Sequence, residues 1–115
     1  MAYEVVFAAD ARHDFTLIFE FLVDSYVSFG DDIETAIMRA ETRVQSIRAD
    51  INQLGQLPYR GTLHDEMLPG LRHLTIGQAI VWFDIDEDVK LVRVLAVFFG
   101  GQDHIRRMLT RLLGE

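Results

Sequence analysis

Cysteine is absent from the 115 residues of this chain. Its absence excludes disulfides, thiolate nucleophiles and cysteine-based metal sites, and it agrees with a reducing compartment such as the cytoplasm, where we expect the protein to act. Long apolar runs are also absent, because none approaches the ~20 residues that a membrane-spanning helix requires. The first ten residues include acidic but no basic side chains, so we do not expect a signal peptide.

Basic residues are scarce. The chain has 11 lysine and arginine residues against 18 acidic ones, which gives a net charge of −7, and Lys90 is its one lysine. Ten acidic residues and four arginines give residues 1–59 a charge of −6, whereas eight acidic and seven basic residues give residues 60–115 a charge of −1. Proteins that bind nucleic acid through phosphates usually have a strongly basic surface. Direct nucleic-acid binding is therefore disfavoured, and the basic cluster that remains is Arg106, Arg107 and Arg111.

Hydrophobic periodicity divides the chain, taken as a single domain over residues 1–115, into seven elements. Alternating apolar residues predict strands, and apolar residues spaced three and four apart predict helices. The predicted elements are a strand at residues 3–8, helices at 10–28 and 31–54, strands at 71–76, 79–85 and 89–99, and a short helix from about 105, with a loop at 56–70.

Polar residues and glycines mark the expected ends of these elements. Asp10 is predicted to cap the first helix, with Asp14 stabilising the positive end of its dipole. Asp31, followed by Glu34 three residues later, resembles a capping box for the second helix. The pair Gly77-Gln78 is typical of a two-residue hairpin turn.

The order strand, helix, helix, three strands, helix predicts an α+β domain, β-α-α-β-β-β-α. The two helices should form a hairpin that packs on one face of an antiparallel sheet. The strand at 89–99 is apolar on nearly every residue from Leu91 to Phe99 except Arg93, so we expect it to be central and covered on both faces. The short last helix should cover part of the second face, leaving an apolar trough there for a second polypeptide.

Three segments carry a resemblance to a known family. They are the loop Pro58-Tyr59-Arg60-Gly61, the strand Leu71-Arg72-His73-Leu74, and the hairpin AIVWFDIDEDVKLVRVLAVFFGG, which leads into Gln102 and Asp103. In order and spacing, over nearly the whole chain, they resemble the RelE/ParE toxin superfamily. The resemblance implies a RelE/ParE-like fold. It also implies the toxin component of a type II toxin–antitoxin (plasmid stabilisation) system, without a cofactor and neutralised by a cognate antitoxin.

Departures from the pattern favour the ParE branch. Members of the ribonuclease branch of this superfamily typically bind mRNA phosphates with a cluster of Lys and Arg. They also have a general acid or base, and usually a Tyr or His near the C-terminus. This chain has only Lys90, has Phe99 where a His is often found, and has no tyrosine after Tyr59. The resemblance therefore implies a protein that binds an essential target such as DNA gyrase and arrests growth without cutting anything, so we lean against an enzyme.

Candidate site residues follow from these patterns. An antitoxin or target is expected to contact Arg72, Trp82, Arg93, Phe99, Arg106, Arg107 and Arg111. If the chain is instead a metal-independent endoribonuclease, its catalytic candidates are Arg60, Arg72, His104 and Arg107. The run His64-Asp65-Glu66 contains metal-ligand residue types. The three are contiguous on a loop with no second His at helical spacing, so we expect no metal site.

The sequence is compatible with three functions. The first is a toxin that acts by protein–protein interaction, and the second is an mRNA interferase. The third is a non-toxic structural relative that serves as a dimerisation module. The antitoxin is the expected partner, no membrane is expected, and the assembly is left open between a homodimer and a toxin–antitoxin heterotetramer.

Overall fold

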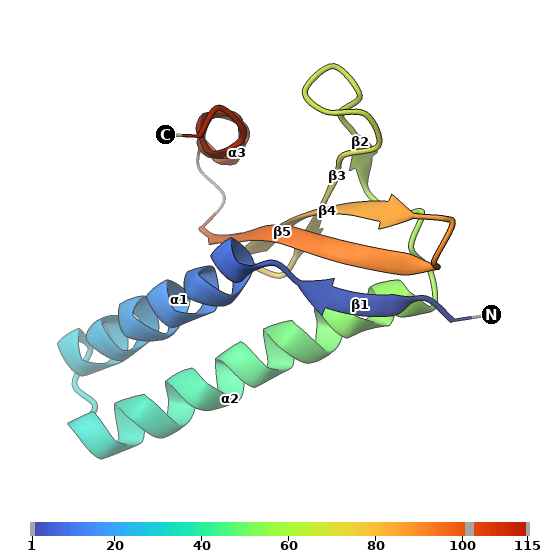
Figure 1. Ribbon diagram of the computed structural model, residues 1–115. Helices are drawn as coiled ribbons and strands as arrows, with labels where there is room; N and C mark the ends of the chain where they lie inside the picture. Colours follow the sequence, from blue (N-terminus) through green and yellow to red (C-terminus); the bar gives the residue numbers. More distant parts are fainter. Residues whose placement is uncertain (1, 101–102, 115) are drawn as a thin grey trace.

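The computed structural model describes residues 2–100 and 103–114 and contains three α-helices and a five-stranded sheet. Figure 1 shows the two long helices below the sheet and the short third helix above it. The elements are β1 (Glu4–Phe7), α1 (Ala9–Ser28), α2 (Ile33–Asn52) with a 3-10 turn, η1 (Gln53–Gly55), β2 (Thr62–Leu63), β3 (Arg72–Ile76), β4 (Ala79–Asp86), β5 (Leu91–Phe99) and α3 (His104–Leu112).

The sheet is mixed, with the strand order β1-β5-β4-β3-β2. β2, β3, β4 and β5 pair antiparallel, but β1 runs parallel to β5. The expectation of a purely antiparallel sheet is thus wrong at one edge. Two tight hairpins reverse the chain between β3 and β5, whereas the long helical connection after β1 allows a parallel return. The loop predicted at 56–70 also contains β2, which pairs with the start of β3.

The helix ends differ slightly from the prediction. Ala8, not Asp10, occupies the N-cap position of α1, and Asp10 lies in the first turn, where its charge still favours the positive helix end. Asp32 caps α2 by accepting a hydrogen bond from the backbone N–H of Thr35 at 2.8 Å. The predicted capping residue, Asp31, lies one position too early.

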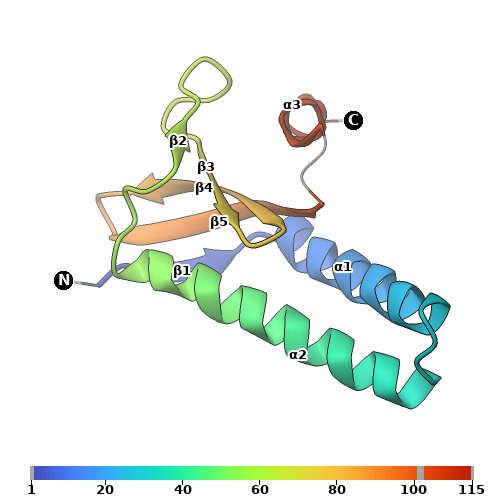
Figure 2. The ribbon, with the colours of Figure 1, turned by 180° about the vertical axis from the view of Figure 1, so that it is seen from behind.

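Helices α1 and α2 pack side by side on one face of the sheet, as Figure 2 shows from behind. This layer encloses the larger core, to which α1 contributes Phe15 and Ile18 and α2 contributes Ile47 and Ile51. β4 and β5 contribute alternate residues to the same core. The predicted helical hairpin over one face is confirmed, and β5 is central, between β1 and β4.

A β-bulge changes which residues of β5 face the helical hairpin. Trp82 pairs with Ala96, but the next residue of β4, Phe83, pairs with Val94, so one extra residue, Leu95, lies in β5. The bulge shifts the alternation of β5 by one position. Val94 and Val97 therefore both face the helical hairpin.

The second face of the sheet is covered by the chain itself. Trp82 and Phe98 are buried there together with Met108 of α3. Met67 and Leu68, from the loop between β2 and β3, pack against them. The trough that we expected on this face for a second polypeptide is therefore not open in the described chain. The open groove lies beside it, between α1, the end of β5 and α3.

Candidate functional site

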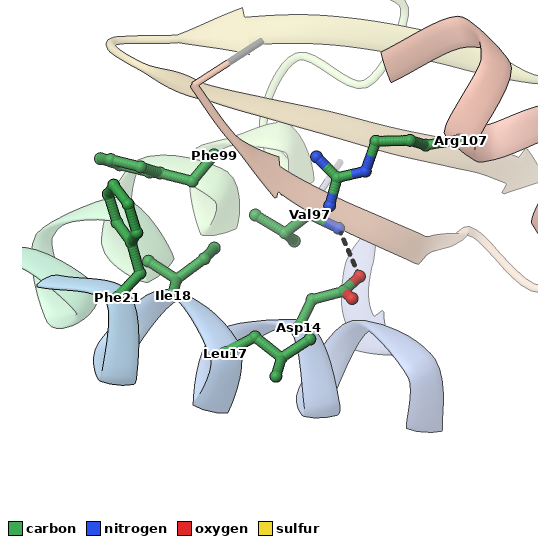
Figure 3. Close-up of a pocket in the computed structure, with 7 residues that line it drawn as sticks. All are labelled: Asp14, Leu17, Ile18, Phe21, Val97, Phe99 and Arg107. Atoms are coloured by element: carbon green, nitrogen blue, oxygen red, sulfur yellow. Dashed lines mark hydrogen bonds between the residues drawn. The ribbon is translucent and has the colours of Figure 1, made fainter. Parts of the chain in front are cut away.

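A groove runs between α1, the C-terminal end of β5 and α3 (Figure 3). On α1, Asp14, Leu17, Ile18 and Phe21 are spaced three and four residues apart, so they share one face of the helix. This face is turned toward Val97 and Phe99 of β5, and Arg107 reaches in from α3. The hollow enclosed has a volume of about 180 Å³.

The floor of the groove is fixed by a buried carboxylate. Asp14 is 3% exposed and accepts a hydrogen bond from the backbone N–H of Val97 at 2.9 Å. Arg111 of α3 donates two hydrogen bonds to the same carboxylate, at 2.7 and 2.9 Å. This hydrogen bonding raises the pKa of Arg111 further above its usual value, although partial burial opposes the shift. α1, β5 and α3 are thereby joined at one point.

The walls of the groove expose large apolar side chains to solvent. Phe21 is 57% exposed and Leu17 is 48% exposed, although both belong to a helix that covers the core. Phe21 lies against the half-buried ring of Phe99, with 5.9 Å between the ring centroids. A second hollow on the other side of this aromatic pair is lined by both rings and by the β3–β4 turn at Gly77 and Gln78. The exposed apolar strip thus extends from α3 to that turn, as expected of a binding surface.

An arginine of α3 contributes positive charge at the groove. The guanidinium of Arg107 lies over the ring of Phe98, 4.2 Å from its centroid, and the residue is exposed. Among the described residues no carboxylate pairs with it, whereas Arg111 is committed to Asp14. Arg106 is exposed but does not line the groove. The groove therefore combines exposed apolar walls with the guanidinium of Arg107, and Arg43 of α2 places a second guanidinium 6.0 Å from the centroid of the Phe99 ring.

Three of the predicted partner-binding residues lie at the groove. Phe99 and Arg107 line it, and Arg111 binds Asp14 at its floor. Arg93 is elsewhere, in a two-bond ion pair with Asp84 of β4 at 3.1 Å. Trp82 is fully buried, so in the described chain it is a core residue and not part of a surface. Arg111 serves as an internal tie between helices.

The predicted catalytic residues do not meet in one place. Arg72 pairs with Phe83 in the sheet, and its guanidinium lies 5.4 Å from the centroid of the Tyr59 ring. Arg60 is exposed in the loop that follows Tyr59. His104, at the start of α3, instead faces the covered side of the sheet, against Trp82. His104 and Arg107 share one side of α3, but Arg72 lies on the opposite face of the sheet, so the four residues do not form a single catalytic site.

Two residues near His104 were not singled out as a site from the sequence. His73 of β3 and His64 of the preceding loop surround Trp82 with His104, and ring centroids within this group lie 4.7–5.5 Å apart. Alternation along β3 was the available signal, because His73 faces away from its neighbour Arg72. Asp65 does not join His64 and Glu66, because its carboxylate accepts a hydrogen bond from the Gly70 backbone N–H.

The described residues contain neither a group of metal ligands nor a membrane-spanning helix. Within 2–100 and 103–114, no group of three or more His, Asp or Glu side chains is arranged to hold a metal ion. No helix in that part of the chain combines the length and apolarity needed to cross a membrane.

The fold is similar to the RelE/ParE type found in toxin–antitoxin structures. A chain of the chromosomal ParDE toxin–antitoxin system from P. aeruginosa is 21% identical over 85% of this chain and 96% of its own, with a TM-score of 0.62. A chain of the toxin–antitoxin complex RelBE2 from Mycobacterium tuberculosis is 18% identical over 86% of this chain and 99% of its own, with a TM-score of 0.52. No family model and no curated protein matches the sequence. The RelE/ParE-like fold implied by the sequence motifs is confirmed.

Proposed function

We propose that this protein is the toxin of a type II toxin–antitoxin pair and that its antitoxin binds the groove between α1, β5 and α3. The observation that carries the proposal is the exposed Phe21–Phe99 strip beside an available arginine, on a fold similar to chains of two toxin–antitoxin structures. Phe21 and Leu17 adjoin one another at the groove, and contiguous exposed apolar side chains are typical of interaction surfaces. A partner that covers them gains apolar burial.

The groove geometry indicates the chemistry of the bound segment. A short amphipathic segment, with apolar residues on one side, fits a strip bounded by a helix and a strand end. A carboxylate at its edge would pair with Arg107, because a guanidinium offers two parallel donors to a carboxylate. An acidic, amphipathic antitoxin tail meets both requirements.

For the free toxin, we propose an essential protein such as DNA gyrase as the target, bound without chemistry on the target. The net charge of −7 disfavours a direct phosphate clamp. Among the candidate catalytic side chains, Arg72 and His104 also lie on opposite faces of the sheet. Induced expression without antitoxin should arrest growth, and the purified protein should inhibit gyrase-catalysed supercoiling in vitro. Normal growth at high expression would favour the non-toxic dimerisation module instead.

An mRNA interferase is the second candidate, and the observation that favours it is the group formed by His64, His73 and His104. Paired imidazoles can serve as general base and acid in attack by a 2′-hydroxyl. Primer extension on abundant transcripts after induction separates the two functions. Cleavage within minutes of induction, with supercoiling unaffected, would replace the gyrase proposal by the ribonuclease.

A further inference from the structure

The covered face of the sheet contains a compact group of histidines that link three separate segments. His64 comes from the loop after β2, His73 from β3 and His104 from the first residue of α3. His64 Nε2 and His73 Nδ1 are 2.6 Å apart, a hydrogen bond between two imidazoles. All three rings lie against Trp82, with centroid distances of 4.9, 5.1 and 5.5 Å. The start of α3 is therefore held to the sheet by ring contacts.

The protonation state of the group is constrained by this hydrogen bond. One of the two facing nitrogens must donate and the other must accept, so the accepting ring has to be neutral at that atom. Addition of a proton to the acceptor places two N–H groups opposite each other at 2.6 Å and breaks the bond. The contact therefore exists only while at least one of the two facing nitrogens is unprotonated.

One extra proton can be accommodated at the rim of the group. His64 Nδ1 faces the exposed carboxylate of Glu66 at 3.4 Å, so a proton there forms an ion pair. A second proton has no such place. His73 and His104 have ring centroids 4.7 Å apart, and the Nδ1 atom of His104 is buried without a hydrogen-bond partner among the described residues. A charge on either ring is therefore opposed by burial and by like charge.

Other charged groups near these rings do not compensate for an added charge. The Asp65 carboxylate accepts from the backbone N–H of Gly70, and the Arg107 guanidinium lies over Phe98. On β4 the neighbouring ring is the neutral indole of Trp82, whose Nε1 is also buried without a partner among the described residues. Glu66 is thus the carboxylate that pairs with the group in the described chain.

We propose that His64, His73 and His104 form a proton-operated latch that holds the N-terminal end of α3 on the sheet when neutral. Acidification releases that end of α3 and the loop at His64, and it uncovers Trp82 and Phe98. The other end of the helix stays tied through Arg111 and Asp14, so the motion is a local opening. Because α3 also carries Arg107, the opening alters one wall of the groove. The latch itself does not depend on the proposed toxin function.

The direction of the pH effect follows from the lowered pKa values of His73 and His104. Burial, then the charges of His104 and His64, lowers the pKa of His73 below its ordinary value of 6.5. Burial, then the charge of His64, lowers the pKa of His104 below the same value. A group with a lower pKa in the closed state binds fewer protons there than in the open state. Closure is thus fully favoured above pH 6.5 and is lost progressively as the pH falls from 6.5 through the lowered values.

Trp82, the single tryptophan, allows a direct test. Acrylamide quenching of its fluorescence reports solvent access, and hydrogen exchange of the α3 amides reports helix release. Between pH 8 and pH 5.5 we expect the quenching constant of the intact protein to rise at least threefold and α3 protection to fall. Hydrogen exchange of the α1 and α2 amides should be unchanged.

Substitutions separate the latch from general acid unfolding. The double variant His73→Gln/His104→Gln should show nearly the same quenching constant at both pH values. His13→Gln, on an exposed position of α1, should behave like the unsubstituted protein. If the double variant misfolds, exchange of the Met108 amide in the unsubstituted protein still decides. The latch is refuted by equal quenching at pH 8 and 5.5, by a rise that persists in the double variant, or by simultaneous loss of α1 and α2.

Discussion

Arg111 in the last helix donates two hydrogen bonds to the buried carboxylate of Asp14 in the first helix, 97 residues away in the sequence. The same carboxylate accepts from the backbone of Val97. This three-way contact positions α3 beside α1 and thereby defines the width of the groove.

Loss of Arg111 should be costly. Arg111→Met leaves a carboxylate whose side chain is 4% exposed without its cation, so we expect a loss of about 3 kcal/mol in the free energy of unfolding. Arg93→Met is the matched control, because Arg93 also makes two bonds to an aspartate but is about half exposed. Its loss should be about 0–1 kcal/mol. Urea unfolding followed by circular dichroism measures both, and equal losses would contradict the structural role of Asp14.

The β2–β3 pairing should depend on Gly61. A Cβ at this residue would overlap the backbone carbonyl of His73, and its φ is +83°. Gly61→Ala should therefore destabilise the protein by about 2–3 kcal/mol. Gly70→Ala has a similar φ of +79° but open space around the added Cβ, so about 1 kcal/mol is expected. Thermal unfolding of the two variants measures both losses of stability. Their difference is the steric cost at Gly61, so Gly61→Ala must destabilise the protein more than Gly70→Ala if β2 pairs as described.

Hydrophobic spacing along the chain predicted the helices and the central strand. The spacing of Phe15, Ile18 and Leu22 predicts a helix whichever partner covers it, and the even run of apolar residues in β5 predicts a central strand. Leu17 and Phe21 extend the apolar surface of α1 beyond one stripe, which by itself predicts a helix covered on two sides, whereas the structure leaves both side chains about half exposed.

Contacts between distant segments were not predictable in this way. From its position near a helix start, Asp14 was interpreted as a dipole partner, because Arg111 lies 97 residues away. The bulge at Leu95 depends on pairing with β4 and has no mark in its own strand. The histidine group forms only when the loop, β3 and α3 come together, so nothing in the sequence relates His64, His73 and His104 to one another.

Packing of α3 on the sheet should depend on Met108. This side chain is 1% exposed in the second core, and Met108→Ala should cost about 2–4 kcal/mol through the cavity that it leaves. Leu109→Ala, one residue later and 43% exposed, should cost under about 1 kcal/mol. Denaturant midpoints measure the difference. Similar costs would mean that α3 does not dock through the Met108 face.

Charge at the groove should affect partner affinity. If an acidic segment pairs with Arg107, then Arg107→Glu should weaken antitoxin binding by about 2 kcal/mol or more, near thirtyfold in Kd. Arg106→Glu changes the net charge equally on an exposed residue that does not line the groove, so its effect should stay within about threefold. Isothermal titration calorimetry at two salt concentrations separates the specific contact from long-range attraction.

The proposed function requires that the antitoxin bind the groove between α1, β5 and α3, which Phe21 lines. The direct measurement is growth of cells that co-express the chain with the product of a small reading frame adjoining its gene. Phe29→Asp serves as the control, because Phe29 is 88% exposed and lies outside the groove. We predict that Phe21→Asp still arrests growth alone but is no longer rescued by the antitoxin, whereas Phe29→Asp is rescued fully. Full rescue of Phe21→Asp, or loss of its toxicity without the antitoxin, would contradict the assignment.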